Sequence, residues 1–127
     1  KIKSHTYCNG KIATVGFSWG GTLGFLAASR LNPNALIVFS PKHIEYYLQE
    51  GKLIDCDTIL HMGKLDYHIT EKTSQKIHAA LVGKFNIAIY LYEAGHGFAD
   101  SQDLDNFCPE AKTLAFQRTF NLIDKLK

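Results

Sequence analysis

Four short apolar runs are spaced along the chain, and longer amphipathic stretches separate them. The runs cover residues 11–17, 35–39, 58–62 and 86–92. They are rich in β-branched and aromatic residues and show little polar alternation, which is typical of strands that are covered on both faces. Turn signals follow two of them, Ser40-Pro41 after the second run and Gly63 after the third. The pattern predicts four buried strands.

Three of the intervening stretches have apolar residues at helical spacing. They cover residues 22–31, residues 70–82 and the segment that opens at Pro109, and residues 44–51 fit a shorter helix. The side chains predicted to face the core are Leu23, Leu26, Ala27 and Leu31 in the first helix, Ile77, Ala80 and Leu81 in the second, and Phe116, Phe120 and Ile123 in the third. Strands that alternate with helices predict an α/β fold, with a mostly parallel sheet of about four strands and helices on both faces.

Composition adds limits to this picture. The 127 residues are 46% hydrophobic and 20% charged, which fits one globular domain spanning residues 1–127. The net charge is only +2 and no basic block is present, so nucleic acid is not an expected partner. No apolar run approaches the ~20 residues that a membrane span needs. Three cysteines without a C-x-x-C pair favour a reducing, cytoplasmic location. Because the first residue is Lys1, we expect the native N-terminus to lie upstream.

Residues 16–20 read G-F-S-W-G, which fits the pattern G-x-S-x-G. The pattern lies where a predicted strand ends and a predicted helix begins, and this is the context that a nucleophile elbow needs. In so tight a turn the neighbours of the nucleophile must be small, as Gly16 and Gly20 are. Ser18 would then project above the sheet, and the Trp19 N–H at the helix start is the candidate oxyanion donor. The alternative is a glycine-rich connection in which Ser18 only caps the helix.

A serine hydroxyl needs a base to remove its proton, and in this fold an acid and then a histidine follow the serine along the chain. Asp66 comes just after the third predicted strand and His96 just after the fourth. All three candidates thus lie at the carboxyl ends of parallel strands, where α/β sheets bind ligands. Taken separately, Asp66 fits a surface turn and His96 a structural loop histidine. Their joint placement favours a catalytic triad.

Four blocks of the sequence resemble the dienelactone hydrolases, a family within the α/β-hydrolase superfamily. They are G-F-S-W-G-G at 16–21, I-E-Y-Y at 44–47, H-M-G-K-L-D at 61–66 and Y-E-A-G-H-G-F-A at 92–99. The resemblance implies a partial α/β-hydrolase fold. It also implies that Ser18 is the nucleophile, Asp66 the acid and His96 the base.

Three features depart from the family pattern. Its namesake members have cysteine at the nucleophile, whereas Ser18 looks more like a general carboxylesterase arrangement. Those members carry a basic residue for the substrate carboxylate where this chain has Asp100, which argues against an anionic dienelactone. Family members are also much longer, and this chain matches their C-terminal half, without the loop that usually donates the second oxyanion hydrogen bond. The strand at 11–17 then lacks a partner, so we expect an open edge at residues 12–15.

The remaining candidates are weaker. Tyr46, Tyr67 and Phe98 are expected to line an apolar substrate pocket, although core packing explains such aromatic residues equally well. His61 and His68 flank Asp66, but their spacing is not that of a zinc site, so we predict no metal.

We therefore predict a serine hydrolase that cleaves small esters or lactones through acylation of Ser18, without a metal or an organic cofactor. The expected partner is a small-molecule ester or lactone, with no nucleic acid and no membrane, and the open edge also fits a homo-oligomer. Two other classes stay open. One is a catalytically impaired half-hydrolase that serves as a binding or dimerisation module. The other is a flavodoxin-like binding domain, although Phe17 and Trp19 are poor neighbours for a phosphate.

Overall fold

The four predicted strands form a single parallel sheet. The computed structural model describes all 127 residues. Its elements are β1 (Ala13–Phe17), α1 (Trp19–Leu31), β2 (Ala35–Phe39), the 3-10 helices η1 (Ile44–Tyr46) and η2 (Leu48–Leu53), β3 (Asp57–Gly63), α2 (Glu71–Leu81), β4 (Ile87–Tyr92) and α3 (Pro109–Asp124). The strands lie in the order β1-β2-β3-β4, and each neighbouring pair is parallel. The predicted α/β class is confirmed.

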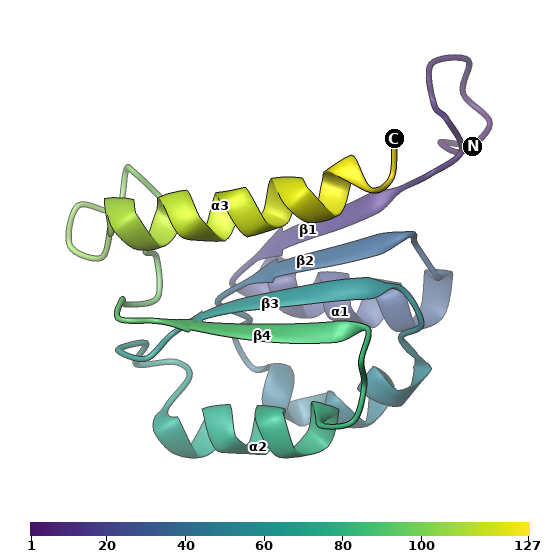
Figure 1. Ribbon diagram of the computed structural model, residues 1–127. Coiled ribbons are helices and arrows are strands. Elements are labelled where there is room, and N and C mark those ends of the chain that lie inside the picture. Colours follow the sequence, from purple (N-terminus) through teal and green to yellow (C-terminus); the bar gives the residue numbers. More distant parts are fainter.

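Helices cover both faces of the sheet, as Figure 1 shows: α3 lies above it, and α1 and α2 lie below. All five residues of β2 are buried, and their side chains alternate between two cores. Leu36 and Val38 belong to the core that α1 and α2 close, which includes Phe25. Ile37 and Phe39 belong to the core under α3. This coverage explains why the strand sequences lack polar alternation.

The buried side of α1 differs from the predicted one. Leu23 and Leu31 are 61% and 76% exposed, whereas Gly21, Gly24, Phe25 and Ala28 are buried. A Cβ atom at Gly21 would lie 2.9 Å from Val38 Cγ1, so the helix lies against the sheet through its glycines. Small residues thus form much of the packed side of α1, and the side predicted from the leucine spacing is wrong.

The buried side of α3 also differs from the predicted one, again because small residues make the close contacts. Phe120 is 55% exposed, and Phe116 and Ile123 are only half-buried. The fully packed residues are Ala111, Ala115, Thr119 and Leu122. Small side chains are needed here because the sheet itself presents large rings to α3, including those of Phe39 and Tyr92.

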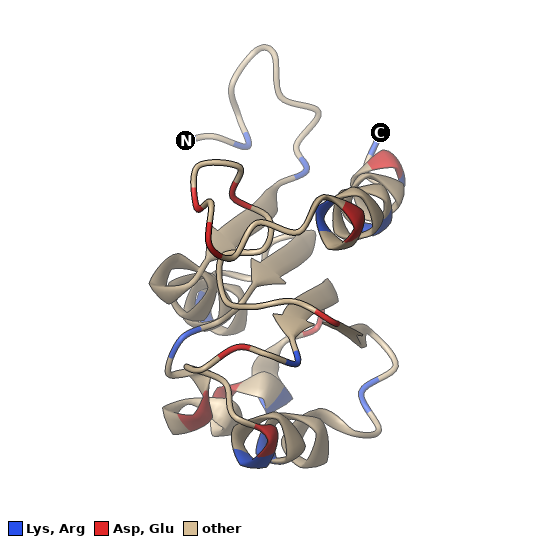
Figure 2. Cartoon of the chain, turned by 90° about the vertical axis from the view of Figure 1, so that its left-hand side faces the viewer, with Lys and Arg blue, Asp and Glu red and all other residues tan.

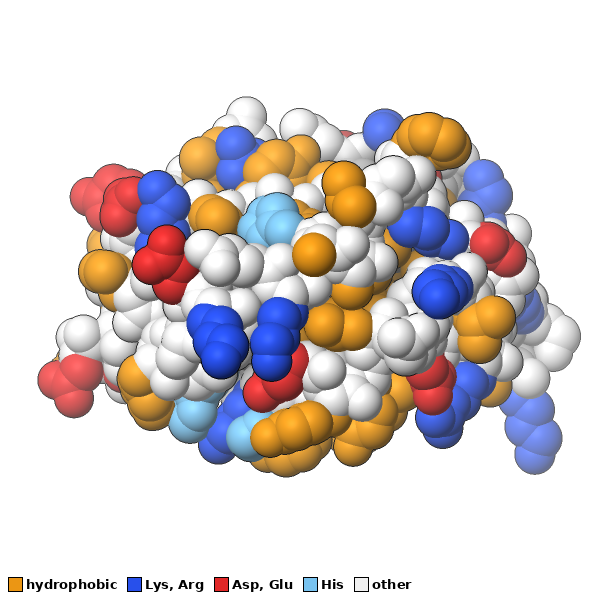
Figure 3. Space-filling model, turned by 90° about the horizontal axis from the view of Figure 1, so that it is seen from below, with side chains coloured by type: hydrophobic (Ala, Val, Ile, Leu, Met, Phe, Trp, Pro, Cys, Tyr) orange, Lys and Arg blue, Asp and Glu red, His pale blue; other side chains and the backbone are white.

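Smaller differences concern element ends. The first strand begins at Ala13, two residues later than predicted, and residues 44–51 form parts of η1 and η2 instead of one α-helix. The helix α1 begins at Trp19, so the Gly20-Gly21 pair lies in its first turn and not in front of it. No helix is both long and apolar enough to cross a membrane. On the face formed by the lower helices, both signs of charge are interspersed (Figure 3).

The outer edge of β1 is open. β1 is the last strand of the sheet on its side and pairs only with β2. Apolar side chains near this edge are exposed: Val15 is 46%, Phe17 51% and Trp19 48% exposed. The structure therefore has the open apolar edge that the sequence predicted.

A polar chain is buried between the sheet and α3. The Arg118 guanidinium donates to the Tyr92 hydroxyl (3.0 Å), which lies 2.8 Å from His61 Nδ1, and His61 Nε2 lies 3.0 Å from Thr119 Oγ1. These contacts are all satisfied if the imidazole is neutral, with Nδ1 accepting and Nε2–H donating. Burial, reinforced by the Arg118 charge, lowers the pKa of His61 to about 3. His61 is therefore a structural residue, neutral at physiological pH.

The depressed His61 pKa predicts an acid-sensitive fold. An unfolded chain protonates this ring near pH 6.5, whereas the folded chain holds it neutral until about pH 3. The unfolded state thus binds more protons inside this window, so the contribution is complete above it and is lost as the pH falls through it. We expect the free energy of unfolding to fall by at most ~1.4 kcal/mol per pH unit from this group.

Urea unfolding of the wild type and of His61→Gln at pH 7, 5.5 and 4.5 measures this effect. The variant is expected to be less stable at pH 7 and to show a shallower decline on acidification, because it has no ring to protonate. Equal declines in both proteins would rule out His61 as the source.

Candidate active site

The turn between β1 and α1 holds Ser18 in a strained backbone conformation. Its φ is 54° and its ψ is −120°, which a residue other than glycine rarely adopts. The Ser18 N–H donates to Phe39 O (2.8 Å), and the Ser18 carbonyl accepts from the N–H groups of Gly21 (3.0 Å) and Lys42 (3.2 Å). The side chain makes no capping hydrogen bond to the helix. The capping alternative is therefore wrong, and the hydroxyl is free to point away from α1.

The two glycines of the G-x-S-x-G pattern differ in how much space surrounds them. A Cβ atom at Gly16 would lie 2.2 Å from the carbonyl oxygen of Gly20, a clash between backbone segments that cannot move apart. A Cβ atom at Gly20 would meet nothing within 4 Å. The expectation that both neighbours must be small is right for Gly16 and wrong for Gly20.

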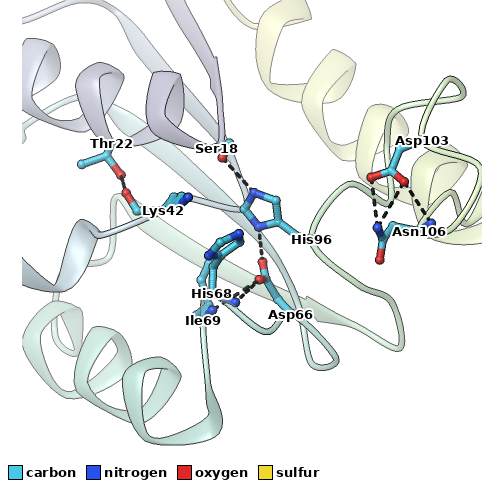
Figure 4. A network of polar contacts seen from close by, with 9 residues as sticks. All are labelled: Ser18, Thr22, Lys42, Asp66, His68, Ile69, His96, Asp103 and Asn106. Carbon is cyan, nitrogen blue, oxygen red and sulfur yellow. Dashed lines mark hydrogen bonds and ion pairs between the residues drawn. The ribbon is translucent and has the colours of Figure 1, made fainter.

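The structure brings Ser18, His96 and Asp66 into one hydrogen-bonded line, drawn in Figure 4. Ser18 Oγ lies 2.8 Å from His96 Nε2, and His96 Nδ1 lies 2.8 Å from Asp66 Oδ2. The three residues follow β1, β4 and β3 respectively, so the parallel strand ends deliver them to the same edge of the sheet.

Burial and backbone hydrogen bonds fix the Asp66 carboxylate. Its side chain is fully buried, and that of His96 is 16% exposed. The second carboxylate oxygen, Oδ1, accepts from the backbone N–H groups of His68 (2.8 Å) and Ile69 (3.3 Å). Asp66 therefore does not belong to a surface turn, and its hydrogen bonds leave Oδ2 aimed at the imidazole.

A cavity of about 240 Å³ adjoins this line of residues. Aromatic and acidic side chains share its walls with Ser18 and His96; the remaining lining residues are Phe17, Phe39, Ser40, Gly97, Phe98, Ala99, Asp100 and Asp103. Viewed onto the carboxyl edge of the sheet, the loop between β4 and α3 is rich in acidic residues (Figure 2). The cavity thus combines an apolar wall with a negatively charged rim.

The aromatic residues predicted for the pocket have three different positions. Phe98 lines the cavity but is fully buried, with its ring centroid 5.2 Å from that of Tyr92, so it is part of the core as well. Tyr67 is 72% exposed, and its ring lies 6.2 Å from that of His96. Tyr46 is 74% exposed and stacks on His43. Neither tyrosine lines the cavity that contains Ser18.

The Trp19 N–H, the candidate oxyanion donor, lies at the start of α1 directly after Ser18. Trp19 is the first residue of α1, where a backbone N–H has no partner within the helix. The positive end of the helix adds to the attraction for negative charge beside Ser18. The indole ring itself is half exposed and lies 4.9 Å from the ring of His43.

The segment after β2 contributes two residues to which the sequence pattern gave no functional role: Ser40 lines the cavity, and the Lys42 N–H donates to the Ser18 carbonyl. From the segment after β3, the His68 ring packs edge-on against His96 at 4.6 Å. Partial burial, and then the charge of Lys42, lowers the pKa of His68. Ser40 directly follows a buried strand. The rule that α/β sheets bind ligands at the carboxyl ends of their strands, which led to Asp66, therefore applied to Ser40 as well.

The structure offers no metal-binding arrangement among these groups. Both ring nitrogens of His61 are occupied by Tyr92 and Thr119, and no group of three histidine, cysteine or acidic side chains is placed to hold an ion.

A parallel sheet with a serine at a strained strand-to-helix turn, and an aspartate and a histidine at later strand ends, defines a partial α/β-hydrolase fold. The sequence model of the dienelactone hydrolase family matches residues 1–126, and the chain belongs to that family.

Known relatives agree with this assignment. The chain is 30% identical over 124 residues to a carboxymethylenebutenolidase from a Pseudomonas species, and 31% identical over 121 residues to carboxymethylenebutenolidase 1 from Cupriavidus pinatubonensis. These alignments cover 98% and 95% of this chain but 52% and 51% of the relatives. The chain therefore spans about half the length of the curated relatives it matches.

Solved structures share the fold at lower identity. A dienelactone hydrolase-like promiscuous phosphotriesterase from metagenomic libraries superposes with a TM-score of 0.83 at 18% identity, covering 97% of this chain and 56% of that one. An esterase from Pyrococcus furiosus gives a TM-score of 0.68 at 14% identity, covering 91% and 53%.

The different surroundings of Gly16 and Gly20 predict opposite effects of alanine. Gly16→Ala should lower the free energy of unfolding by ~2–4 kcal/mol and disturb the turn, because its Cβ meets backbone atoms. Gly20→Ala should be neutral or stabilise α1 by up to ~1 kcal/mol, because alanine is the better helix former. Chemical denaturation of both variants measures the difference, and similar losses in the two would contradict it.

Proposed function

We propose that this protein is a serine hydrolase that cleaves small esters or lactones by acylation and deacylation of Ser18. The observation that carries the proposal is the continuous hydrogen-bond line from Ser18 Oγ through His96 to the buried carboxylate of Asp66. Its order and spacing are those that activate a serine hydroxyl.

The reaction follows from these positions. His96 Nε2 takes the Ser18 proton as Oγ attacks the substrate carbonyl carbon, and the carbonyl oxygen becomes an oxyanion next to the Trp19 N–H. Collapse of this intermediate breaks the ester bond, and the imidazolium returns the proton to the departing alcohol oxygen. A water molecule then loses a proton to His96 and attacks the acyl carbon. Collapse of this second intermediate breaks the bond to Ser18 Oγ, which takes the proton back from His96, and the acid is released.

Asp66 acts through His96. Its Oδ2 accepts the Nδ1–H of the ring, which leaves Nε2 as the lone-pair nitrogen facing Ser18. The carboxylate also stabilises the imidazolium that forms during each step.

The cavity favours small and uncharged substrates. Phe17, Phe39 and Phe98 provide apolar surface, while Asp100 and Asp103 repel an anion. The names of the curated relatives point to cleavage of a lactone that carries a carboxymethylene group. The acidic rim of this cavity favours a lactone or short-chain ester without that negative charge. Among the aromatic residues proposed to bind substrate, Phe98 backs the cavity wall from within the core, Tyr67 borders His96 on the exposed side, and Tyr46 extends the aromatic surface beyond His43.

Replacement of Ser18 tests the proposal. We expect Ser18→Ala to abolish hydrolysis of p-nitrophenyl acetate and labelling by a fluorophosphonate, since the covalent bond cannot form. Ser18→Cys should keep part of the activity. Circular dichroism should be unchanged, because the hydroxyl contributes little packing. Unchanged turnover in the alanine variant would refute the role of Ser18.

A second candidate function is supported by the open edge of β1. We propose that residues 1–127, as a single domain, correspond to the C-terminal half of a longer hydrolase, and that in isolation this chain associates through residues 12–15. An edge strand presents unpaired backbone groups, and the exposed Val15 and Phe17 add an apolar surface. Such association fits a dimerisation module with weak activity, because the loop that usually donates the second oxyanion hydrogen bond in such hydrolases is not expected among these residues.

Light scattering of the 127-residue chain tests this association. We expect a dimer or larger species, and we expect Val15→Lys to shift it toward the monomer, because a lysine on an edge strand opposes pairing. Val82→Lys is the matched control, since Val82 is 80% exposed at the end of α2, beside β4 at the opposite edge of the sheet. A stable wild-type monomer with ordinary hydrolytic activity would contradict the proposal.

A further inference from the structure

Ser40 is a buried hydroxyl without a partner. The residue is 3% exposed, and its Oγ atom makes no hydrogen bond within the protein. Its φ of 47° is in the left-handed region, which a serine adopts at a cost. The backbone N–H donates to His61 O (2.8 Å), so the main chain is anchored even though the side chain is not.

The sheet register puts Ser40 next to Ser18. Phe17 of β1 pairs with Phe39 of β2, and each strand is followed directly by one of the two serines. Both serines line the 240 Å³ cavity, together with His96. The unpaired hydroxyl therefore belongs to the same cavity as the reactive line of residues, on its buried side.

Folding does not account for this hydroxyl. A buried polar group that lacks a partner weakens the folded state, and alanine or glycine at this position would avoid that cost. A bound molecule with a hydrogen-bonding atom in the cavity supplies the missing partner. A hydroxyl in a mostly apolar wall also fits the usual design of a small-molecule site, where a few polar groups fix the orientation of the ligand.

We propose that Ser40 is a specificity-determining residue, whose Oγ–H donates a hydrogen bond to a neutral oxygen in the acyl part of the substrate. The proposal rests on the proposed function, in which the acyl group stays on Ser18 while the alcohol departs to solvent. The group that stays attached occupies the enclosed part of the cavity, which is where Ser40 lies. Asp100 and Asp103 in the same cavity oppose a carboxylate there, so the acceptor is an ether, hydroxyl or ring oxygen.

Two esters of equal size distinguish this role: p-nitrophenyl methoxyacetate and p-nitrophenyl butyrate differ by an oxygen in place of a methylene. For Ser40→Ala, we expect kcat/KM to fall about three- to tenfold for the methoxyacetate, the range of one hydrogen bond, and to stay within twofold for the butyrate. Because each ester is compared between the wild type and Ser40→Ala, the different intrinsic reactivities of the two esters cancel. Ser74→Ala, on α2, is the matched control and should change neither value.

A binding measurement separates failure of this proposal from failure of the proposed function. In the Ser18→Ala background, NMR titration with ethyl methoxyacetate and ethyl butyrate reports binding without turnover. Adding Ser40→Ala should weaken binding of the methoxyacetate by a similar factor and leave the butyrate unchanged. If the wild type shows no turnover but this difference in binding is found, the proposal for Ser18 fails, while Ser40 is still the residue that binds the ligand oxygen.

Thermal unfolding provides the last readout. Because the Ser40 hydroxyl has no protein partner, Ser40→Ala is expected to keep or raise the Tm. A variant that loses stability while both esters are affected equally would show that the hydroxyl holds a structural water, and would overturn the proposal. Equal kcat/KM values and equal binding in wild type and variant would overturn it as well.

Discussion

The site depends on one backbone junction, in which Ser18 joins β1, β2 and α1. Its N–H is bonded to the end of β2, and its carbonyl accepts from the first turn of α1 and from Lys42. These bonds hold a φ of 54° that the residue would not adopt alone. They can form only because Gly16 lets the backbone of Gly20 approach, and Gly21 lets α1 lie on the sheet.

Backbone strain is concentrated at this edge of the sheet. Four residues other than glycine have a positive φ, and three of them, Ser18, Ser40 and His43, lie at or near the ends of β1 and β2. The fourth, Asn32, ends α1 in the left-handed conformation that helix ends commonly use. The strained backbone of Ser18 and Ser40 thus lies beside the cavity. Hydrogen bonds from their N–H groups to the neighbouring strands hold it in place.

Much of this architecture could be predicted from the sequence because it depends on local signals. Buried strands appear as continuous apolar runs, and the strand-end rule predicted where Ser18, Asp66 and His96 meet. The helix faces could not be predicted in the same way. In α1 and α3 the close contacts are made by Gly21, Gly24 and Ala115, whereas periodicity arguments give weight to the large apolar residues.

The strand-end rule also applied to Ser40, but the missing partner of its hydroxyl could not be predicted from the sequence. A serine before a proline reads as an ordinary turn signal, and nothing in the pattern tells whether its hydroxyl finds a partner. That property depends on everything that surrounds the side chain in three dimensions. The same holds for His61, whose neutral state follows from burial against Tyr92 and Thr119, two residues far away in sequence.

The division of the site between covered and open surfaces explains how a chain that spans about half the length of its relatives can hold the proposed proton relay. The relay joins residues that follow β1, β3 and β4, and the strands between them are paired within these 127 residues. Its geometry therefore needs no interaction from outside. The oxyanion side is different, because Trp19 stands at the open edge with about half of its surface exposed. In the proposed mechanism, binding of the developing charge therefore depends more on the surroundings of the open β1 edge than activation of the serine does.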